Sequence, residues 1–528
     1  MGVSQAIEEE IRTNRRAIAR LKREIFGVDK TCKSRYIREF VSEFRSFKSI
    51  VTADDVIEEA SRRDIVYFGD YHPLEASQDW VLRLMKELSA RGRKVVLALE
   101  MLHARQQETL DRWMKGAINE AQFLEEIDYR SDWGFDWRSY RRFFELAKDP
   151  FIPIFGIDSD HRDNLKYIRG RDRLAARRIG TIRKFFPEHL ILVVIGESHL
   201  ASGHLPAEVR AELGRSGREI VIVQNIDEIY WRLLRRGREN AEAVKIDGNR
   251  YCVFTAFPML KYRAYREIID VWTEGEDADA ATPFLHDTIE EIRAFLAKKG
   301  RKPRIALANG RRETVEAILP EVQFRSTYHA LSAYMRSRKM DQHEITAILE
   351  NLKYDGMRYV PEINVLLMVK NDPSRMIREA ARFVLHLMRG EIMERRVKRI
   401  SMEDEFYGTV LAEALVCFAA KVVNPSMDCV RDDFPLRSPD ARRAHRAAVR
   451  GGGVRGLGPK KRRLIARALG ARLGEALHLS YHEGRVTRER IAELFATRFE
   501  TPDSSRKLFL RLSGGARGRG EAPRDRSK

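Results

Sequence analysis

The feature that most constrains the fold of this chain is an alternation of short apolar runs with amphipathic segments between residues 64 and 223. In the first intervening segment, Trp80, Leu84 and Leu88 recur at helical spacing, and the later segments are similar. Strands that alternate with helices form βαβ units, which build a mostly parallel sheet covered on both faces. The sequence therefore predicts an α/β fold with strands at residues 64–68, 94–99, 152–157, 191–195 and 219–223.

The chain is too long for a single domain. It has 528 residues, and hydrophobic cores usually stop growing at about 250–300 residues. An acidic stretch of small residues, 273–280, is typical of a linker, and the sequence beyond it is mainly helical. The predicted parts are a helical arm (1–50), an α/β domain (51–272), a helical domain (281–435), and a basic helical region with a disordered tail (436–528).

Positive charge is concentrated near the C-terminal end. The formal net charge is +19, and residues 437–475 alone hold 12 Lys and Arg against Asp440 and Glu475. Residues 506–528 hold 8 more against two acids, so the first 436 residues are close to neutral. Residues 437–475 are therefore the expected contact for nucleic acid or another acidic partner. Few aromatic residues interleave these charges, so both kinds of partner stay open.

The sequence offers no sign of a membrane span or an export signal. Uninterrupted apolar runs, such as 191–195 and 365–369, are far shorter than the ~20 residues that cross a bilayer. The first residues lack the apolar core of a secretory signal. The four cysteines are scattered without a C-x-x-C pair, which favours reduced thiols over disulfides or a zinc knuckle. A cytoplasmic protein is expected.

One local pattern follows two of the predicted strands. Residues Gly69–His72 and Gly196–His199 both consist of a glycine, an acid, one further residue and a histidine. The glycine allows a sharp turn out of the sheet, and ligands of open parallel sheets bind beyond the carboxyl ends of the strands. Two more acids, Glu100 and Asp158, directly follow predicted strands. We therefore expect these acids and both histidines along one rim of the sheet.

This set of side chains suits two kinds of chemistry. Histidine and carboxylate together bind zinc, manganese or iron, and the candidate metal ligands are His72, His199, Asp70, Glu100 and Glu197. A histidine can also act as a base oriented by an acid, without metal. The candidate catalytic residues are His72, Glu100, His199, Asp158 and Arg171. Either motif alone is more often a loop or capping histidine, and only its repetition favours a site.

Five segments of the chain, in this order, resemble the ChaN-like family, which belongs to a larger grouping with Tiki proteases, TraB proteins and erythromycin esterases. The resemblance covers residues from about 60 to 230, and its most specific segment carries Glu100, Met101, Gln107, Leu110, Asp111, Trp113 and Gly116. The other segments are GDYHPLEASQ (69–78), DWGFDWRSYRRFFELA (132–147), the Arg171-Asp172 helix, and GESHLASGHLP (196–206). One departure is Asp70, which stands where the family usually has Glu.

Three hypotheses for function follow, of which the resemblance implies the first two. The first is a module that binds haem or a divalent metal, with His72, His199, Tyr71 and His204 as candidate cofactor-binding residues. The second is a metal-dependent hydrolase of the Tiki or esterase type, acting on a small molecule or peptide. The third is an adaptor whose basic C-terminal region binds a partner. Tyr71 could be an iron ligand or a packing residue, and Arg171 could hold an anion or form a plain ion pair.

Overall fold

The computed structural model describes residues 4–28, 34–148, 152–159, 167–214, 218–274, 281–297, 305–306, 312–313, 318–325, 327–393, 401–430, 446, 448–449, 454–498 and 503–516. The chain divides into two compact units. We call residues 18–278 the N-terminal unit, and residues 1–17 with 279–528 the C-terminal unit. The four predicted parts stay a prediction, but the expected arm is shared between the units, because residues up to Ala17 group with the C-terminal one.

The N-terminal unit is built around an eight-stranded sheet of order β1-β7-β8-β6-β2-β5-β3-β4. From β8 to β4 all neighbouring strands run parallel, whereas β7 and β1 are antiparallel additions at one edge. This confirms the predicted α/β class with a mostly parallel sheet. The strands are β1 (Ser49–Val51), β2 (Ile65–Asp70), β3 (Val95–His103), β4 (Ile154–Asp158), β5 (Leu190–Gly196), β6 (Glu219–Gln224), β7 (Ala243–Lys245) and β8 (Arg250–Val253).

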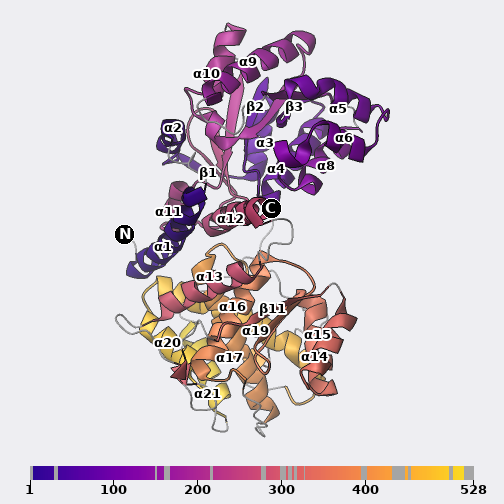
Figure 1. Cartoon of the computed structure of the whole chain (residues 1–528). Coiled ribbons are helices and arrows are strands. Elements are labelled where there is room, and N and C mark those ends of the chain that lie inside the picture. The colour runs from indigo at the N-terminus through magenta and orange to yellow at the C-terminus, as the bar shows by residue number, and fades with distance from the viewer. Residues whose placement is uncertain are drawn as a thin grey trace. The chain divides into compact units, whose positions relative to one another are not determined.

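Helices cover both faces of this sheet (Figure 1). The core on one face includes side chains from α3 (Ala53–Ser61), α4 (Glu75–Ala90), α5 (Gln107–Met114), α6 (Glu120–Glu126), α7 (Tyr129–Asp132) and α8 (Trp137–Ala147). The core on the other face includes side chains from α2 (Arg35–Glu43), α9 (Ile168–Phe185), α10 (Leu205–Leu213) and α11 (Asp227–Leu234). Strands buried on both sides need apolar residues at every position, which explains the uninterrupted runs in the sequence.

One strand differs from its predicted bounds in a way that matters for the site. Strand β3 continues to His103, so Glu100 lies inside it and does not follow its end. The pairing with β4 shifts between Leu99 and His103. Met101 and Leu102 stay buried there, which keeps the chain extended past the expected end.

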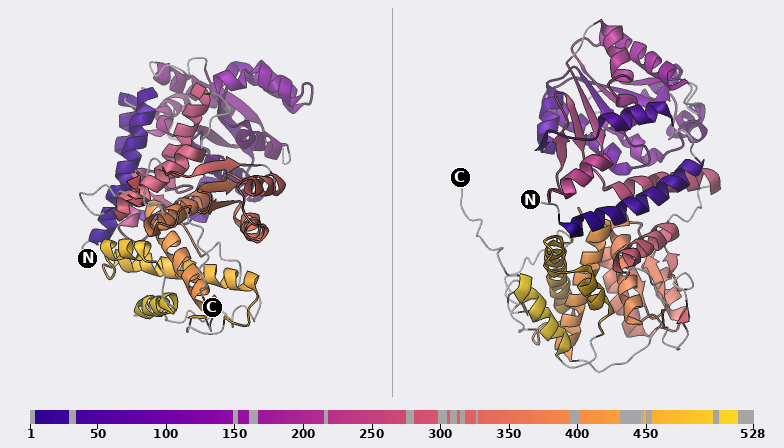
Figure 2. Two further views of the ribbon diagram at one scale, coloured as in Figure 1. Left: turned by 60° about the horizontal axis from the view of Figure 1, so that its bottom comes forward. Right: turned by 90° about the vertical axis from the view of Figure 1, so that its left-hand side faces the viewer.

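The C-terminal unit is mainly helical, as predicted, but it also contains small sheets. Strands β11 (Glu321–Phe324), β13 (Val365–Met368) and β12 (Met357–Val360) form one, and β9 (Ile305–Ala306) with β10 (Arg312–Glu313) forms another. The helices are α13 (Ala281–Leu296), α14 (Tyr328–Ser337), α15 (Gln342–Asp355), α16 (Pro373–Arg389), α17 (Met402–Val423), α19 (Pro459–His482), α20 (Arg488–Ala496) and α21 (Ser504–Ala516). Helix α17 packs against α16, α19 and α21 (Figure 2).

Two further helices complete the described elements. Helix α1 (Gln5–Val28) begins in the C-terminal unit and continues into the N-terminal unit, and α12 (Pro258–Glu274) ends the N-terminal unit. Residues 275–280 of the predicted linker lie outside the described residues. The predicted disordered tail is in part helical, since α21 extends to Ala516, and residues 517–528 lie outside the described residues.

Among the described residues, α17 is the one helix long and apolar enough to span a membrane by length and composition. The sequence analysis did not identify this helix as long and apolar enough for a membrane span, because Asp404 and Glu413 interrupt its apolar runs. Most of the helix is buried within the unit, as in the core helix of a folded domain.

Candidate functional site

At the end of β2, Asp70 holds His72 in one orientation. Its Oδ2 atom lies 2.9 Å from His72 Nδ1 and accepts a 2.7 Å hydrogen bond from the Tyr140 hydroxyl. Its Oδ1 atom accepts hydrogen bonds from Ser77 Oγ at 2.6 Å and Gln78 Nε2 at 2.7 Å. All four partners fix one buried carboxylate. The imidazole of His72 is thereby turned so that its Nε2 atom lies 3.6 Å from Glu100 Oε2, beside Gly196.

Glu100 on β3 lies at the centre of the site. Its Oε1 atom accepts a 2.6 Å hydrogen bond from Arg171 Nη2, and its Oε2 atom accepts one of 2.6 Å from the backbone N–H of Gly196. The Nε2 atoms of His72 and His199 lie 3.6 Å and 3.4 Å from its carboxylate. Burial raises the pKa of Glu100, but His199 and Arg171 outweigh this, so the pKa is well below its usual range. Glu100 is therefore a buried carboxylate anion.

Arg171 on α9 connects Glu100 to the end of the next strand. It donates to both oxygens of Asp158, with Nε to Oδ1 at 2.8 Å and Nη2 to Oδ2 at 2.7 Å. The guanidinium and both carboxylates are almost fully buried. Burial lowers the pKa of Arg171, but Asp158 and Glu100 raise it by more, so the net pKa lies above its usual value. The result is a buried ion triad behind the two histidines.

His199, which follows β5, is oriented by a carboxylate in the same way as His72. Its Nδ1 atom lies 2.6 Å from Asp172 Oδ1, and the Tyr36 hydroxyl donates to Asp172 Oδ2 at 2.7 Å. Burial lowers the pKa of His199, but Asp172 and Glu100 raise it to about 9. Both ring nitrogens of His199 thus face carboxylates, Asp172 at Nδ1 and Glu100 at Nε2, which favours the protonated ring.

Gly196 allows these side chains to approach the backbone of β5. A Cβ atom at this position would lie 3.3 Å from His72 Nε2, 3.4 Å from Glu100 Oε2 and 3.7 Å from His199 Cδ2. The glycine of the second motif is thus needed for space and not for the predicted turn, since its φ of −50° is open to any residue.

A cavity of about 610 Å³ opens over this cluster within the N-terminal unit. His72 lies in its wall with 21% of its side chain exposed, whereas Glu100 and His199 are almost fully buried. Further lining residues come from α1, α2, the strand ends, α9, α11 and α12: Lys22, Ile25, Ile37, Arg38, Phe40, Val41, Phe44, Arg45, Asp70, Tyr71, Arg171, Glu197, Asp227, Lys261, Tyr262 and Tyr265.

The remaining predicted residues occupy different positions. Tyr71 lies in the cavity wall, with Lys261 Nζ 5.0 Å from its ring centre. Glu197 also lines the cavity and pairs with Lys261 at 3.1 Å. Burial raises the pKa of Glu197 although Lys261 opposes it. Asp158 is joined to the site only through Arg171.

His204 does not line the cavity. Its Nδ1 atom is 2.8 Å from the Ser198 carbonyl oxygen and its Nε2 atom is 3.2 Å from Glu39 Oε2. Its ring stacks on that of Tyr36, with 3.6 Å between centres. Both nitrogens are therefore engaged, and His204 as a cofactor-binding residue stays a prediction.

Sequence reasoning missed two residues of the cluster, Asp172 and Tyr36. Asp172 stands next to Arg171 in the Arg-Asp pair of the fourth family-like segment, so the signal was present. Tyr36 lies on α2, outside the segments that resemble the family, and no local pattern marks it.

The predicted metal ligands at the rim and the predicted basic surface stay predictions. Among the described residues, the His and acid side chains that come close enough to hold a metal ion together are elsewhere, in the C-terminal unit: Glu10, His478 and His482. Of residues 437–475, the structure describes 446, 448–449 and 454 onwards. In that described part Arg463 and Arg467 pair with Glu350 and Asp355, while Lys460 and Lys461 are exposed.

Comparison with known proteins agrees with the first motif, Gly69–His72, and with the segments up to residue 147. Residues 56–166 match the family described as "Haem-binding uptake, Tiki superfamily, ChaN", which confirms the ChaN-like resemblance of this part of the chain. A solved structure described as "Cofacial heme binding to ChaN of Campylobacter jejuni" is 17% identical, with 33% of this chain and 86% of that chain covered and a TM-score of 0.25. No curated protein matches the chain.

Proposed function

We propose that the N-terminal unit binds haem in the 610 Å³ cavity, with His72 as the ligand to the iron. The observation that carries the proposal is the orientation of His72, whose Nδ1 atom is held by Asp70 at 2.9 Å while its partly exposed side chain lies in the cavity wall. Histidines that ligate metals are typically held in this way, with the second ring nitrogen bonded to a carboxylate. Haem iron is commonly bound by histidine or tyrosine.

The other residues of the cavity suit a flat apolar molecule with carboxylate groups. The volume of the cavity lies within the range of roughly 300–1,000 Å³ that is usual for cofactor pockets. Ile25, Phe40 and Phe44 supply apolar surface for the ring system. Arg38 and Arg45 are exposed on α2 and its C-terminal end, where they can pair with propionates.

His199 and Tyr71 have secondary parts in this proposal. Both ring nitrogens of the buried His199 face carboxylates, Asp172 at 2.6 Å and Glu100 at 3.4 Å, so His199 is a hydrogen-bonding group near the bound molecule and not the proposed iron ligand. Tyr71 lies beside His72 in the same wall and is the alternative ligand. The description of the matched family as haem-binding supports the choice of haem over other molecules of this shape.

Titration of the full-length protein with haemin tests the proposal. We expect a saturable shift of the Soret band with wild-type protein, and at least a tenfold weaker affinity in His72→Ala. His189→Ala is the matched control, because His189 precedes β5 at the opposite end of the strand that leads to His199. Metal-free protoporphyrin should bind both variants equally, since it makes no iron bond. Failure of the wild type to bind haemin saturably would refute the proposal, and a loss in Tyr71→Phe alone would move the ligand to Tyr71.

A divalent metal at the rim fits the charges less well. Arg171 and the backbone N–H of Gly196 occupy the two oxygens of Glu100, and the ring nitrogens of His199 face Asp172 and Glu100, so two of the predicted ligands already have other partners. The metal-dependent hydrolase, the adaptor role and the cytoplasmic location stay predictions from the sequence. Metal analysis of the wild type and of His72→Ala distinguishes the first of these from haem binding, because only a divalent metal held at the rim would be lost with His72.

A further inference from the structure

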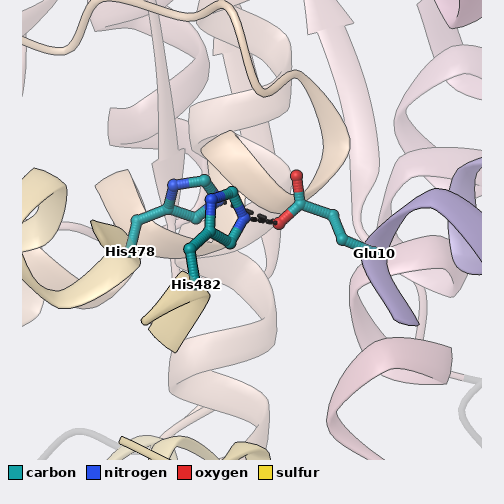
Figure 3. Close-up of side chains that lie close together, drawn as sticks. All are labelled: Glu10, His478 and His482. Carbon is teal, nitrogen blue, oxygen red and sulfur yellow. Dashed lines mark hydrogen bonds and ion pairs between the residues drawn. The ribbon is translucent and has the colours of Figure 1, made fainter. Parts of the chain in front are cut away.

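Three side chains from opposite ends of the sequence meet in the C-terminal unit. Glu10 lies on α1, whereas His478 and His482 lie one helical turn apart near the end of α19. The i, i+4 spacing places both imidazoles on one face of the helix. Figure 3 shows both rings turned toward the carboxylate of Glu10.

Both histidines contact the same oxygen atom. The distances from His478 Nε2 and from His482 Nε2 to Glu10 Oε2 are each 2.9 Å. All three potential ligand atoms lie within 4.8 Å of one another. Two imidazoles directed at one carboxylate oxygen leave a common point that a cation can share.

The second oxygen of the carboxylate gives an independent indication. Glu10 is fully buried, and its Oε1 atom has no hydrogen-bond partner among the described residues. A buried acceptor without a partner is rare in folded proteins and calls for an explanation such as a water or an ion. The triad as it stands is therefore incomplete as a hydrogen-bonded structural tie.

The residues around the triad leave its negative charge available. The neighbouring Glu9 is paired with Arg488, and the ammonium of Lys421 donates to the Met427 carbonyl oxygen at 2.7 Å. The ring of Phe418 meets that of His478 edge to face. The site thus combines one buried carboxylate, two imidazoles and an apolar wall.

We infer that Glu10, His478 and His482 form a binding site for a divalent cation of the zinc class, which fastens the first turns of α1 to α19. Two histidines and one glutamate are an established zinc donor set, with a fourth position for water. Tetrahedral coordination at about 2.0–2.1 Å per bond needs roughly 3.3 Å between ligand atoms. The 2.9 Å contacts must therefore open by a few tenths of an ångström.

Zinc binding by the full-length protein tests this site. After treatment with a chelator, the protein is titrated with Zn²⁺ alone by calorimetry or by competition with a fluorescent indicator. We expect the wild type to bind one Zn²⁺ ion tightly, with an affinity that is at least 100-fold weaker in Glu10→Gln and in His482→Ala. His386→Ala is the matched control, because His386 makes a single 2.9 Å contact with Glu391 in the same unit without a second histidine. His72→Ala changes the rim of the N-terminal unit and should still bind the tight Zn²⁺ ion.

The spectrum of bound Co²⁺ gives a second readout on wild-type protein. Intense ligand-field bands of four-coordinate cobalt are expected, and they should be displaced by one equivalent of Zn²⁺. Circular dichroism shows whether the variants fold, and the cobalt spectrum decides the matter if they do not. Wild-type protein without a tight equivalent, or variants that retain it unchanged, would overturn the inference, as would the weak bands of six-coordinate cobalt.

Discussion

Replacement of Arg171 by methionine is the sharpest test of the buried cluster beneath the cavity. The change removes three hydrogen bonds, two to Asp158 and one to Glu100, and leaves a side chain of similar length. Both carboxylates have side chains no more than 5% exposed, so neither can recover its solvation from water. Removing one partner of a buried ion pair typically costs about 3–5 kcal/mol. We expect a loss of that size in the free energy of unfolding of the N-terminal unit.

Tryptophan fluorescence reports on this unit in the full-length chain. All six tryptophans lie between Trp80 and Trp272, within residues 18–278. Urea unfolding followed by fluorescence therefore measures the N-terminal unit without truncating the protein. Arg169→Met is the control on the same helix, because Arg169 forms an exposed pair with Glu39. Exposed pairs contribute about 0–1 kcal/mol, so this variant should unfold almost like the wild type.

The pH dependence of the stability lost in the Arg171 variant has a predicted direction that can be checked. Glu100 has a lowered pKa in the wild type, so its contribution to stability is present at neutral pH and is lost as the pH falls. In the variant, Glu100 has lost its arginine partner and becomes neutral more easily in acid, which removes the cost of burying an unpaired charge. The difference in the free energy of unfolding between the wild type and the variant should therefore decrease at lower pH. A loss below about 1 kcal/mol, or a difference that grows in acid, would refute the reasoning.

Three further predictions follow from the same residues and from the basic helix. The pKa of His199 is raised to about 9, so protonated His199 contributes up to about 3 kcal/mol to the free energy of unfolding. This contribution is full below pH 6.5, the usual pKa of histidine, and is lost as the pH rises through 9. Urea unfolding at pH 7 and pH 10 should show the loss in wild-type protein and a smaller one in His199→Gln. Gly196→Ala places a Cβ atom 3.3 Å from His72 Nε2, so it should cost about 1–3 kcal/mol in urea unfolding and weaken haemin binding, whereas normal stability with normal affinity would show that the site can adapt. Replacing the exposed Lys460 and Lys461 by glutamine should lower the salt concentration of elution from heparin and reduce the slope of log affinity against log salt by about 2; an unchanged slope would place the polyanion surface elsewhere.

The sequence alone was sufficient for the α/β fold and for much of the site. Apolar strands alternating with amphipathic helices can bury both faces of a sheet in few ways, and parallel order brings the strand ends to one edge. His72 and His199 therefore came together as predicted from two short motifs, and the family match covers the segment that contains His72. The position of Glu100 within β3 was not predictable, because the extension of that strand depends on residues packed against it later in the chain.

Other features required the tertiary structure. Tyr36 reaches Asp172 across 136 residues of sequence, and the raised pKa of His199 results from that burial and from the charges around it, not from any local pattern. The His-x-x-x-His spacing of residues 478 and 482 was visible in the sequence, but its partner Glu10 lies 468 residues from His478. Local sequence determines which side chains leave a strand or a helix face and in which direction. Only packing decides which of them meet, because a contact between distant segments depends on every element that lies between them.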